Sequence, residues 1–470
     1  MKKISGWSFF DLWRLDGVVD RGPYAAIGLL GFVVKYNLDR LIASAIFHQP
    51  WDLFKYIIPQ KPLFLISGDW HDPSENEIFL FGTILVVALP FIWIGVALTL
   101  RRLRAIGLPT WLVTLFFFPV INLIFFLLLA ILPSRPTEDS QFFERKEKGV
   151  LNWIIPDHPL GSAWVALVFT LLFGLIAAIL STKIFASYGW GLFVALPFCL
   201  GLVSVLLYSH RSPRSFRSCL LVAVLSIALL GVGFLGLAVE GVICLLMAAP
   251  IALVLAIMGG SVGYFIQRCS WNRDQTLKVC LLLMLSVPLL MGAELVSVPR
   301  EPLFSVCTSV EINAPPERVW QSVVTFSELP EPTELLFRLG IAYPVKATIQ
   351  GTGVGAVRHC EFSTGPFVEP IEVWDEPRLL KFSVTQNPAP MQEWTPYRAI
   401  NPPHLHGFLV SEGGQFLLKP LPNGKTQLEG TTWYRHHMWP AGYWQIWSDQ
   451  IIHQIHLRVL KHIQYLAENG

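Results

Sequence analysis

The chain has 470 residues, of which 53% are hydrophobic and 14% charged, and its mean hydropathy is +0.51. Soluble domains carry about 25% charged residues, so this deficit indicates exposure to lipid. The net charge of +2 and the lack of basic runs interleaved with aromatic residues give no reason to expect a nucleic-acid partner. The seven cysteines show no C-x-x-C spacing, so neither a zinc site nor a dithiol motif is predicted.

Long apolar stretches fill most of the first 299 residues, and a helix needs about 20 such residues to cross the hydrocarbon. The first stretch is interrupted by Lys35 and Asp39, whose i,i+4 spacing allows them to pair. Glu240, between two uncharged stretches, is predicted to lie in an exposed turn. The seven predicted spans are Gly22–Phe47, Ile78–Leu100, Ala163–Thr182, Ser187–Tyr208, Cys219–Val239, Gly241–Gln267 and Val279–Val298.

An eighth apolar stretch, residues 108–132, is broken by Pro119 and Asn122. Lys and Arg concentrate in cytoplasmic loops, so their distribution separates a full span from a re-entrant hairpin. A hairpin places seventeen basic loop residues inside and three outside, whereas a full span places eight inside and twelve outside. The sequence therefore predicts a re-entrant hairpin, seven full spans and a C-terminal domain outside the cytoplasm.

The N-terminal region, residues 1–135, contains a set of spaced motif residues: Gly17, Arg21, Tyr24, Leu98, Arg101, Arg102, Leu103, Gly107 and Trp111. With these residues it resembles a bacterial family of small inner-membrane proteins known mainly as a domain of unknown function. That resemblance implies a bacterial inner-membrane location, with the C-terminal domain on the periplasmic face, and no activity. Residues 136–299 are assigned to further transmembrane helices, and Arg101 and Arg102 are expected to end a span and contact lipid head groups.

Residues 300–470 have the mixed composition of a soluble domain. Alternation predicts a first strand, Ser305–Asn313, and Pro315 then opens a helix through Trp320. A short helix at Pro332–Leu339 and a long amphipathic helix at Pro440–Ala467 are also predicted. The remaining strands are predicted at Val345–Gln350, Ala356–Ser363, Phe367–Val373, Leu379–Thr385, Gly407–Ser411, Gln415–Pro420 and Thr426–Tyr434.

This order of elements, with the segments EINAPPERVW, GxGxGxxRxCEF and EVWDEPRLLKF, resembles the START-like superfamily, also called SRPBCC, which includes birch-pollen allergens and polyketide cyclases. The resemblance implies an α+β helix-grip fold, in which a curved antiparallel sheet surrounds a long C-terminal helix. It also implies an apolar cavity for a hydrophobic molecule. The residues expected to line the cavity are Phe362, Trp374, Phe382, Phe416, Trp433, Trp444, Ile451 and Ile455.

Histidine is enriched at the end of the chain, where seven of the twelve follow residue 400. His453 and His456 have i,i+3 spacing, which suits a metal or acid–base chemistry. Their angular positions on the helix, however, predict that both point away from the cavity. No catalytic set, metal site or cofactor is therefore predicted.

The expected function is binding or transfer of a hydrophobic, lipid-like molecule by a domain anchored in the membrane. Its partners would be membrane lipids and a small hydrophobic ligand. Two alternatives stay open: an enzyme of cyclase or hydrolase type that acts in the same cavity, and a membrane regulatory or scaffold protein.

Overall fold

The computed structural model describes residues 9–49, 51, 53, 56, 75–134, 150–269, 275–296, 302–397, 400 and 402–469. The chain divides into two compact units. The first contains Met1–Gln60, Pro73–Leu237 and Ala248–Val298. The second contains Lys61–Asp72, Ala238–Met247 and Pro299–Gly470, so the turn before helix α9 and the first residues of that helix belong to it.

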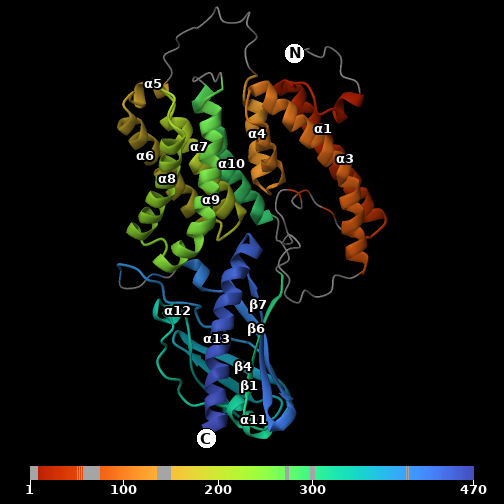
Figure 1. The fold of residues 1–470 in the computed structure, drawn as a ribbon, viewed down its shortest axis with the longest axis vertical. Helices are drawn as coiled ribbons and strands as arrows, with labels where there is room; N and C mark the ends of the chain where they lie inside the picture. The colour runs from red at the N-terminus through yellow and green to blue at the C-terminus, as the bar shows by residue number, and fades with distance from the viewer. Residues whose placement is uncertain are drawn as a thin grey trace, which may run out of the picture. The chain divides into compact units, whose positions relative to one another are not determined.

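The regular elements of the first unit, among its described residues, are all helices (Figure 1), and α9 begins in the second unit. Its elements are η1 (Phe9–Trp13), α1 (Arg21–Ala45), α3 (Glu75–Ile106), η2 (Thr110–Phe117), α4 (Ile121–Ile131), α5 (Val150–Ile154), α6 (Pro159–Ile179), η4 (Leu180–Ile184), η5 (Gly191–Ala195), α7 (Leu196–Tyr208), α8 (Phe216–Gly236), α9 (Val242–Gln267) and α10 (Thr276–Val296).

Six helical segments of the described chain are long and apolar enough to cross a membrane, so the protein is a multi-pass membrane protein. The remaining predicted span, Gly22–Phe47, corresponds to α1 and is not among these six segments, because charged and polar residues interrupt its apolar stretch. The six segments are Phe79–Ile106, Pro159–Ile184, Gly191–Tyr208, Phe216–Gly236, Val242–Arg268 and Thr276–Val296.

Helix α7 forms the centre of this unit, since each of its residues is buried. It approaches α9 closely: a Cβ atom on Gly201 would lie 2.1 Å from the carbonyl oxygen of Ala256, and one on Gly259 equally close to that of Phe198. Small residues let helix backbones meet in lipid, where van der Waals packing rather than the hydrophobic effect drives association. The glycines thus explain how α7 is surrounded so completely.

Lys35 and Asp39 on α1 form the ion pair that their spacing predicts. Both residues are buried, and the hydroxyl group of Tyr56 also donates to the carboxylate of Asp39. A buried carboxylate requires such compensation, because removing a charge from water is costly. The pair therefore holds a charged helix face inside the protein.

The stretch at residues 108–132 is not one helix. A γ-turn at Val120 (φ 67°, ψ −47°), in which the Ile121 N–H donates to the Pro119 carbonyl at 2.7 Å, separates η2 from α4. The Leu108 N–H donates to the Leu103 carbonyl, and the Leu132 carbonyl accepts from Arg102. Both ends of the stretch therefore return to the same turn of α3.

Arg102 closes this arrangement. Its guanidinium donates to the carbonyls of Leu129 (2.9 Å) and Leu132, which are acceptors left open at the end of α4, and to that of Val19 (3.2 Å). Arg101 donates to the Asp11 carbonyl at 2.7 Å. Both arginines are at most 1% exposed, so the expectation that they contact lipid head groups is wrong.

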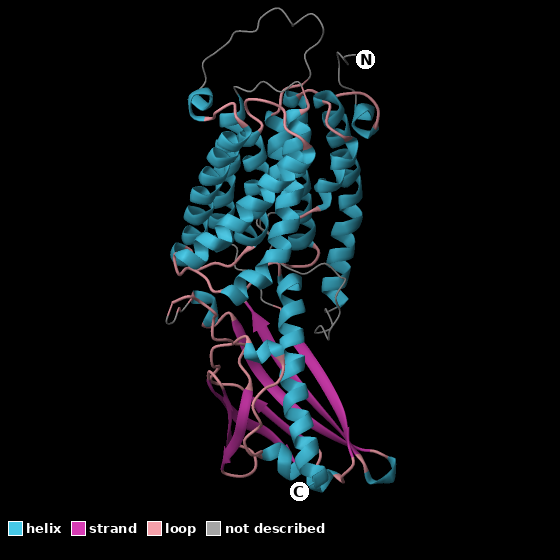
Figure 2. Cartoon of the chain, turned by 60° about the vertical axis from the view of Figure 1, so that its left-hand side comes forward, coloured by secondary structure: helices cyan, strands magenta, loops and turns pink. Residues whose placement is uncertain are grey.

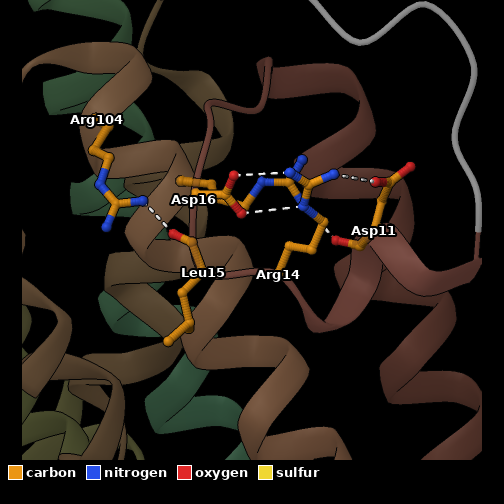
Figure 3. Close-up of polar contacts among 6 residues, drawn as sticks. Asp11, Arg14, Leu15, Asp16 and Arg104 are labelled. Carbon is orange, nitrogen blue, oxygen red and sulfur yellow. Dashed lines mark hydrogen bonds and ion pairs between the residues drawn. The ribbon is translucent and has the colours of Figure 1, made fainter.

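Arg104, two residues after Arg102 on α3, behaves differently (Figure 3). It donates to the carbonyl of Leu15, in a segment where Arg14 pairs with Asp16 at 2.9 Å and with Asp11 at 3.7 Å. These contacts lie at the surface, where ion pairs contribute little stability.

The second unit is built around one antiparallel sheet and a long helix, α13 (Ala441–Asn469) (Figures 1 and 2). The strands follow the order β1-β7-β6-β5-β4-β3-β2 and curve around α13. This is the helix-grip fold that the sequence predicts. The strands are β1 (Phe304–Ile312), β2 (Pro344–Gln350), β3 (Val357–Phe362), β4 (Gly365–Asp375), β5 (Leu379–Ser383), β6 (Leu409–Pro420) and β7 (Thr426–His436), and the short helices are α11 (Pro316–Val324), α12 (Leu335–Arg338), η7 (Pro403–Leu405) and η8 (Pro422–Gly424).

The break predicted between the strands Gly407–Ser411 and Gln415–Pro420 is wrong. Gly413 and Gly414, in that break, lie within the single strand β6, where the register shifts between Ser411 and Gly413. A Cβ atom on Gly414 would lie 2.7 Å from the Phe382 ring, and one on Gly413 would lie 2.8 Å from the Phe382 carbonyl oxygen. The glycines therefore serve a β-bulge and the close packing of Phe382.

Replacing Arg102 with Lys keeps the charge on α3. It removes the planar set of donors that bonds to the carbonyls of Val19, Leu129 and Leu132. We expect the Arg102→Lys protein to lose about 3 kcal/mol of stability and about 5–10 °C of melting temperature in detergent. Arg104→Lys is the matched control, with a shift below about 2 °C. Equal shifts in the two variants would show that Arg102 does not hold the end of α4.

Candidate ligand cavity

A cavity of about 110 Å³ lies inside the second unit, between the sheet and α13. Its wall combines aromatic and aliphatic side chains with polar groups on β3, β4, β6, β7 and α13. The lining residues are Arg358, Cys360, Phe362, Phe367, Glu369, Phe382, Val384, Ser411, Gly413, Gln415, Phe416, Gly430, Thr431, Thr432, Ile452, Ile455, His456, Val459 and Leu460.

An ion pair between Arg358 and Glu369 is the most unusual feature of this wall. The two residues are direct partners across strands β3 and β4, and both are buried, at 1% and 6% exposure. Aromatic rings surround the guanidinium, whose carbon lies 5.5 Å from the ring centroids of Phe326 and Phe416. Cation–π contacts of this kind compensate part of the lost hydration.

The electrostatics of the pair follow from its burial. Burial raises the pKa of Glu369, and the charge of Arg358 opposes that rise. The Nε atom of Arg358 is buried and has no hydrogen-bond acceptor among the described residues. The cavity wall thus contains a buried cationic donor, held beside the carboxylate of Glu369.

A second polar feature is a chain of hydrogen bonds from α13 to the sheet. The imidazole of His456 bonds through Nε2 to the hydroxyl of Thr432 (2.7 Å) and through Nδ1 to that of Thr308 (3.2 Å). Thr308 also contacts Nδ1 of His453 at 2.8 Å. Burial lowers the pKa of His456 to about 4, with a smaller contribution from His453, so this imidazole is neutral at pH 7.

The eight residues predicted for the cavity divide evenly. Phe362, Phe382, Phe416 and Ile455 line it. The other four lie elsewhere in the second unit. Trp374 packs edge-on against Trp320, Trp433 lies beneath the Lys381 ammonium, Trp444 is buried beside Tyr443, and Ile451 joins the small apolar cluster of Phe337, Ile341, Met391 and Leu405.

Sequence reasoning also missed polar residues of the wall. The prediction that His456 points away from the cavity is wrong, because a helical wheel measures direction from the apolar face and ignores how the sheet curves. Arg358 carried a usable signal: it lies four residues before Phe362 on the same strand, and alternation puts both on one face. Its partner Glu369 then follows from the hairpin register.

With the geometry established, the second unit is defined as a helix-grip domain and the chain as a membrane protein that carries it. The predicted helix-grip fold of residues 300–470 and the predicted helical membrane region before it are confirmed. Residues 13–142 match the model of a family described as "Protein of unknown function (DUF805)". No curated protein matches the chain.

Several solved structures are similar to part of the chain at low sequence identity. Truncated norcoclaurine synthase from Thalictrum flavum is 12% identical over 36% of this chain and 96% of its own, with a TM-score of 0.25. Protein XoxI from Bacillus cereus is 19% identical over 35% of this chain and 96% of its own, with a TM-score of 0.23. Zhui aromatase/cyclase from Streptomyces sp. R1128 is 13% identical over 35% of this chain and 94% of its own, with a TM-score of 0.24.

The neutral state of His456 predicts a pH dependence. In the unfolded chain its pKa returns to about 6.5, so below that pH the unfolded state binds a proton that the folded state excludes. The fold therefore loses stability as the pH falls from about 6.5, by up to about 3 kcal/mol near pH 4.

The measurement is the melting temperature of the purified full chain at pH 7 and at pH 5. We expect a smaller acid-induced decrease in His456→Gln, which removes this proton site, than in the parent protein. His359→Gln, on the opposite face of β3 from Arg358, is the control and should behave like the parent. An unchanged decrease in His456→Gln would contradict the assignment.

Proposed function

We propose that the helix-grip domain binds a hydrophobic molecule with one polar or anionic group, and that the helical unit anchors this domain in a membrane. The observation that carries the proposal is the Arg358–Glu369 pair inside an aromatic cavity. Apolar pockets with a few placed polar groups are the usual form of small-molecule sites. The membrane would be the source or the destination of the ligand.

The size of the cavity limits what can bind. An apolar cavity of about 150 Å³ accepts benzene, so about 110 Å³ accommodates at most one ring or a short acyl segment. We therefore propose that the cavity receives a small aromatic or acyl group, with its polar end directed to Arg358.

The probe that tests this is 4-fluorobenzoate, which combines one ring with one carboxylate. We expect it to bind the purified chain in lipid nanodiscs, as a broadened and shifted ¹⁹F signal. Ser411→Phe, which fills the cavity, should weaken binding at least about tenfold, because the ring then has no space. Thr385→Phe, an exposed position just after the neighbouring strand β5, is the matched control.

A double variant, Arg358→Met with Glu369→Leu, tests the polar part of the proposal. Replacing both partners avoids leaving a buried charge unpaired, so the domain should fold. We expect it to lose 4-fluorobenzoate and to keep uncharged 4-fluorotoluene. Equal binding of 4-fluorobenzoate to the parent and to both cavity variants would refute the site.

An enzyme of cyclase or hydrolase type is the second candidate, and the neutral imidazole of His456 is the observation that favours it. A neutral imidazole with both nitrogens hydrogen-bonded can accept and return a proton. Loss of turnover with retained 4-fluorobenzoate binding in His456→Gln would identify catalysis. If His456→Gln loses neither turnover nor 4-fluorobenzoate binding, binding remains the proposed function.

We further propose that the membrane is a bacterial inner membrane, that residues 108–132 form a re-entrant hairpin, and that the helix-grip domain is periplasmic. The charge distribution supports this topology, and so does the return of both ends of the hairpin to Arg102 and Leu103. Backbone that is not helical is tolerated at membrane depth where protein buries it, as at Val120 (2% exposed).

A reporter enzyme that is active only in the periplasm, fused after Gly470, should be active. A cytoplasm-specific reporter at the same position should be silent. The opposite pattern would place the domain in the cytoplasm and remove the support for the hairpin.

A further inference from the structure

Three metal-binding side chains converge in the second unit, away from the ligand cavity. Glu240 lies in the turn before α9, Cys244 in the first turn of that helix, and His404 in η7. All three belong to the same compact unit although about 160 residues separate the first from the last. Their ligand atoms all lie within 4.8 Å of one another, and this is the only such group among the described residues.

The distances inside the group are short. The Sγ atom of Cys244 lies 2.8 Å from Nε2 of His404, and Oε2 of Glu240 lies 3.4 Å from Nδ1 of the same ring. Glu240 and His404 are buried, at 8% and 6% exposure, so the expectation of an exposed turn at Glu240 is wrong. Side chains that approach in this way from separate segments are already ordered before any ion binds.

A second carboxylate holds the site in place. Glu393 accepts hydrogen bonds from the backbone N–H groups of Ile243 (3.1 Å) and Cys244 (3.2 Å), which are open donors at the start of α9. The Val242 N–H donates to the Trp394 carbonyl at 2.8 Å. Gly241 is required here, since a Cβ atom would lie 2.0 Å from the Glu393 carboxylate.

We propose that Glu240, Cys244 and His404 form a binding site for a divalent transition metal of the zinc class. Thiolate, imidazole and carboxylate are the ligands that zinc takes in proteins, at about 2.0–2.3 Å, so two ligand atoms on one ion lie at most about 4.6 Å apart. With one ligand atom taken from each residue, the observed separations stay within 4.8 Å, slightly above this limit. Cys244 and Glu240 contact opposite nitrogens of the His404 ring, so a side-chain rotation must bring both to the same nitrogen when an ion binds. The carboxylates of Glu240 and Glu393 beside Cys244 favour a cation there.

Three protein ligands leave a fourth position for water or another small ligand. Such a site differs from closed structural zinc sites, which use four ligands. Binding requires that Cys244 lose its proton, so affinity should increase with pH. The site stands independently of the ligand cavity and of the function proposed for it.

The test uses the purified full chain in detergent, stripped with a chelator and titrated with Co²⁺. We expect one equivalent to bind with a thiolate-to-cobalt charge-transfer band, which one equivalent of Zn²⁺ abolishes. Cys244→Ser should lose the band, and His404→Asn and Glu240→Gln should weaken binding at least about tenfold. The matched controls at exposed positions, Cys307→Ser and His406→Asn, should bind Co²⁺ like the parent.

Zinc-edge X-ray absorption of the parent protein covers the case in which a variant does not fold. One sulfur at about 2.3 Å, with nitrogen and oxygen at about 2.0 Å, supports the site. No charge-transfer band, a band that survives in Cys244→Ser, or a zinc shell without sulfur would each overturn it. The trio would then be a hydrogen-bonded structural contact only.

Discussion

Buried polar groups need partners away from water, and in this protein those partners come from distant parts of the chain. Arg102 serves three backbone carbonyls on two segments, and Glu393 accepts from two amides at the start of α9. In lipid this requirement is strict, because an unsatisfied backbone group costs several kcal/mol. The same requirement explains Glu294, which accepts from the Gly191 N–H at 2.8 Å where η5 begins.

This constraint also gives the motif residues of the N-terminal family a physical meaning. Gly17 (φ 86°) and Gly107 (φ 86°) adopt backbone conformations that other residues rarely reach. Gly107 ends α3 by donating to the Leu103 carbonyl at 2.8 Å, which brings the next segment back beside Arg102. These residues therefore make the contacts that fold the segment.

In the helix-grip domain, the same constraint places charge in the cavity. Packed apolar residues are often at least as stable as a buried ion pair, so stability alone does not explain the Arg358–Glu369 pair. Ligand recognition is consistent with the position of Arg358 among three aromatic rings. The imidazole of His456 completes a wall that is polar at a few points and apolar elsewhere.

The sequence by itself determined the apolar helices, the alternating strands and the final helix, because those signals are local and periodic. It also determined the Lys35–Asp39 pair, whose members lie one helical turn apart. Only the tertiary structure decided which rings line the cavity and that His456 faces it, since sheet curvature sets those directions. The Glu240–Cys244–His404 group was equally hidden, because its members meet only when the chain between α9 and η7 has folded.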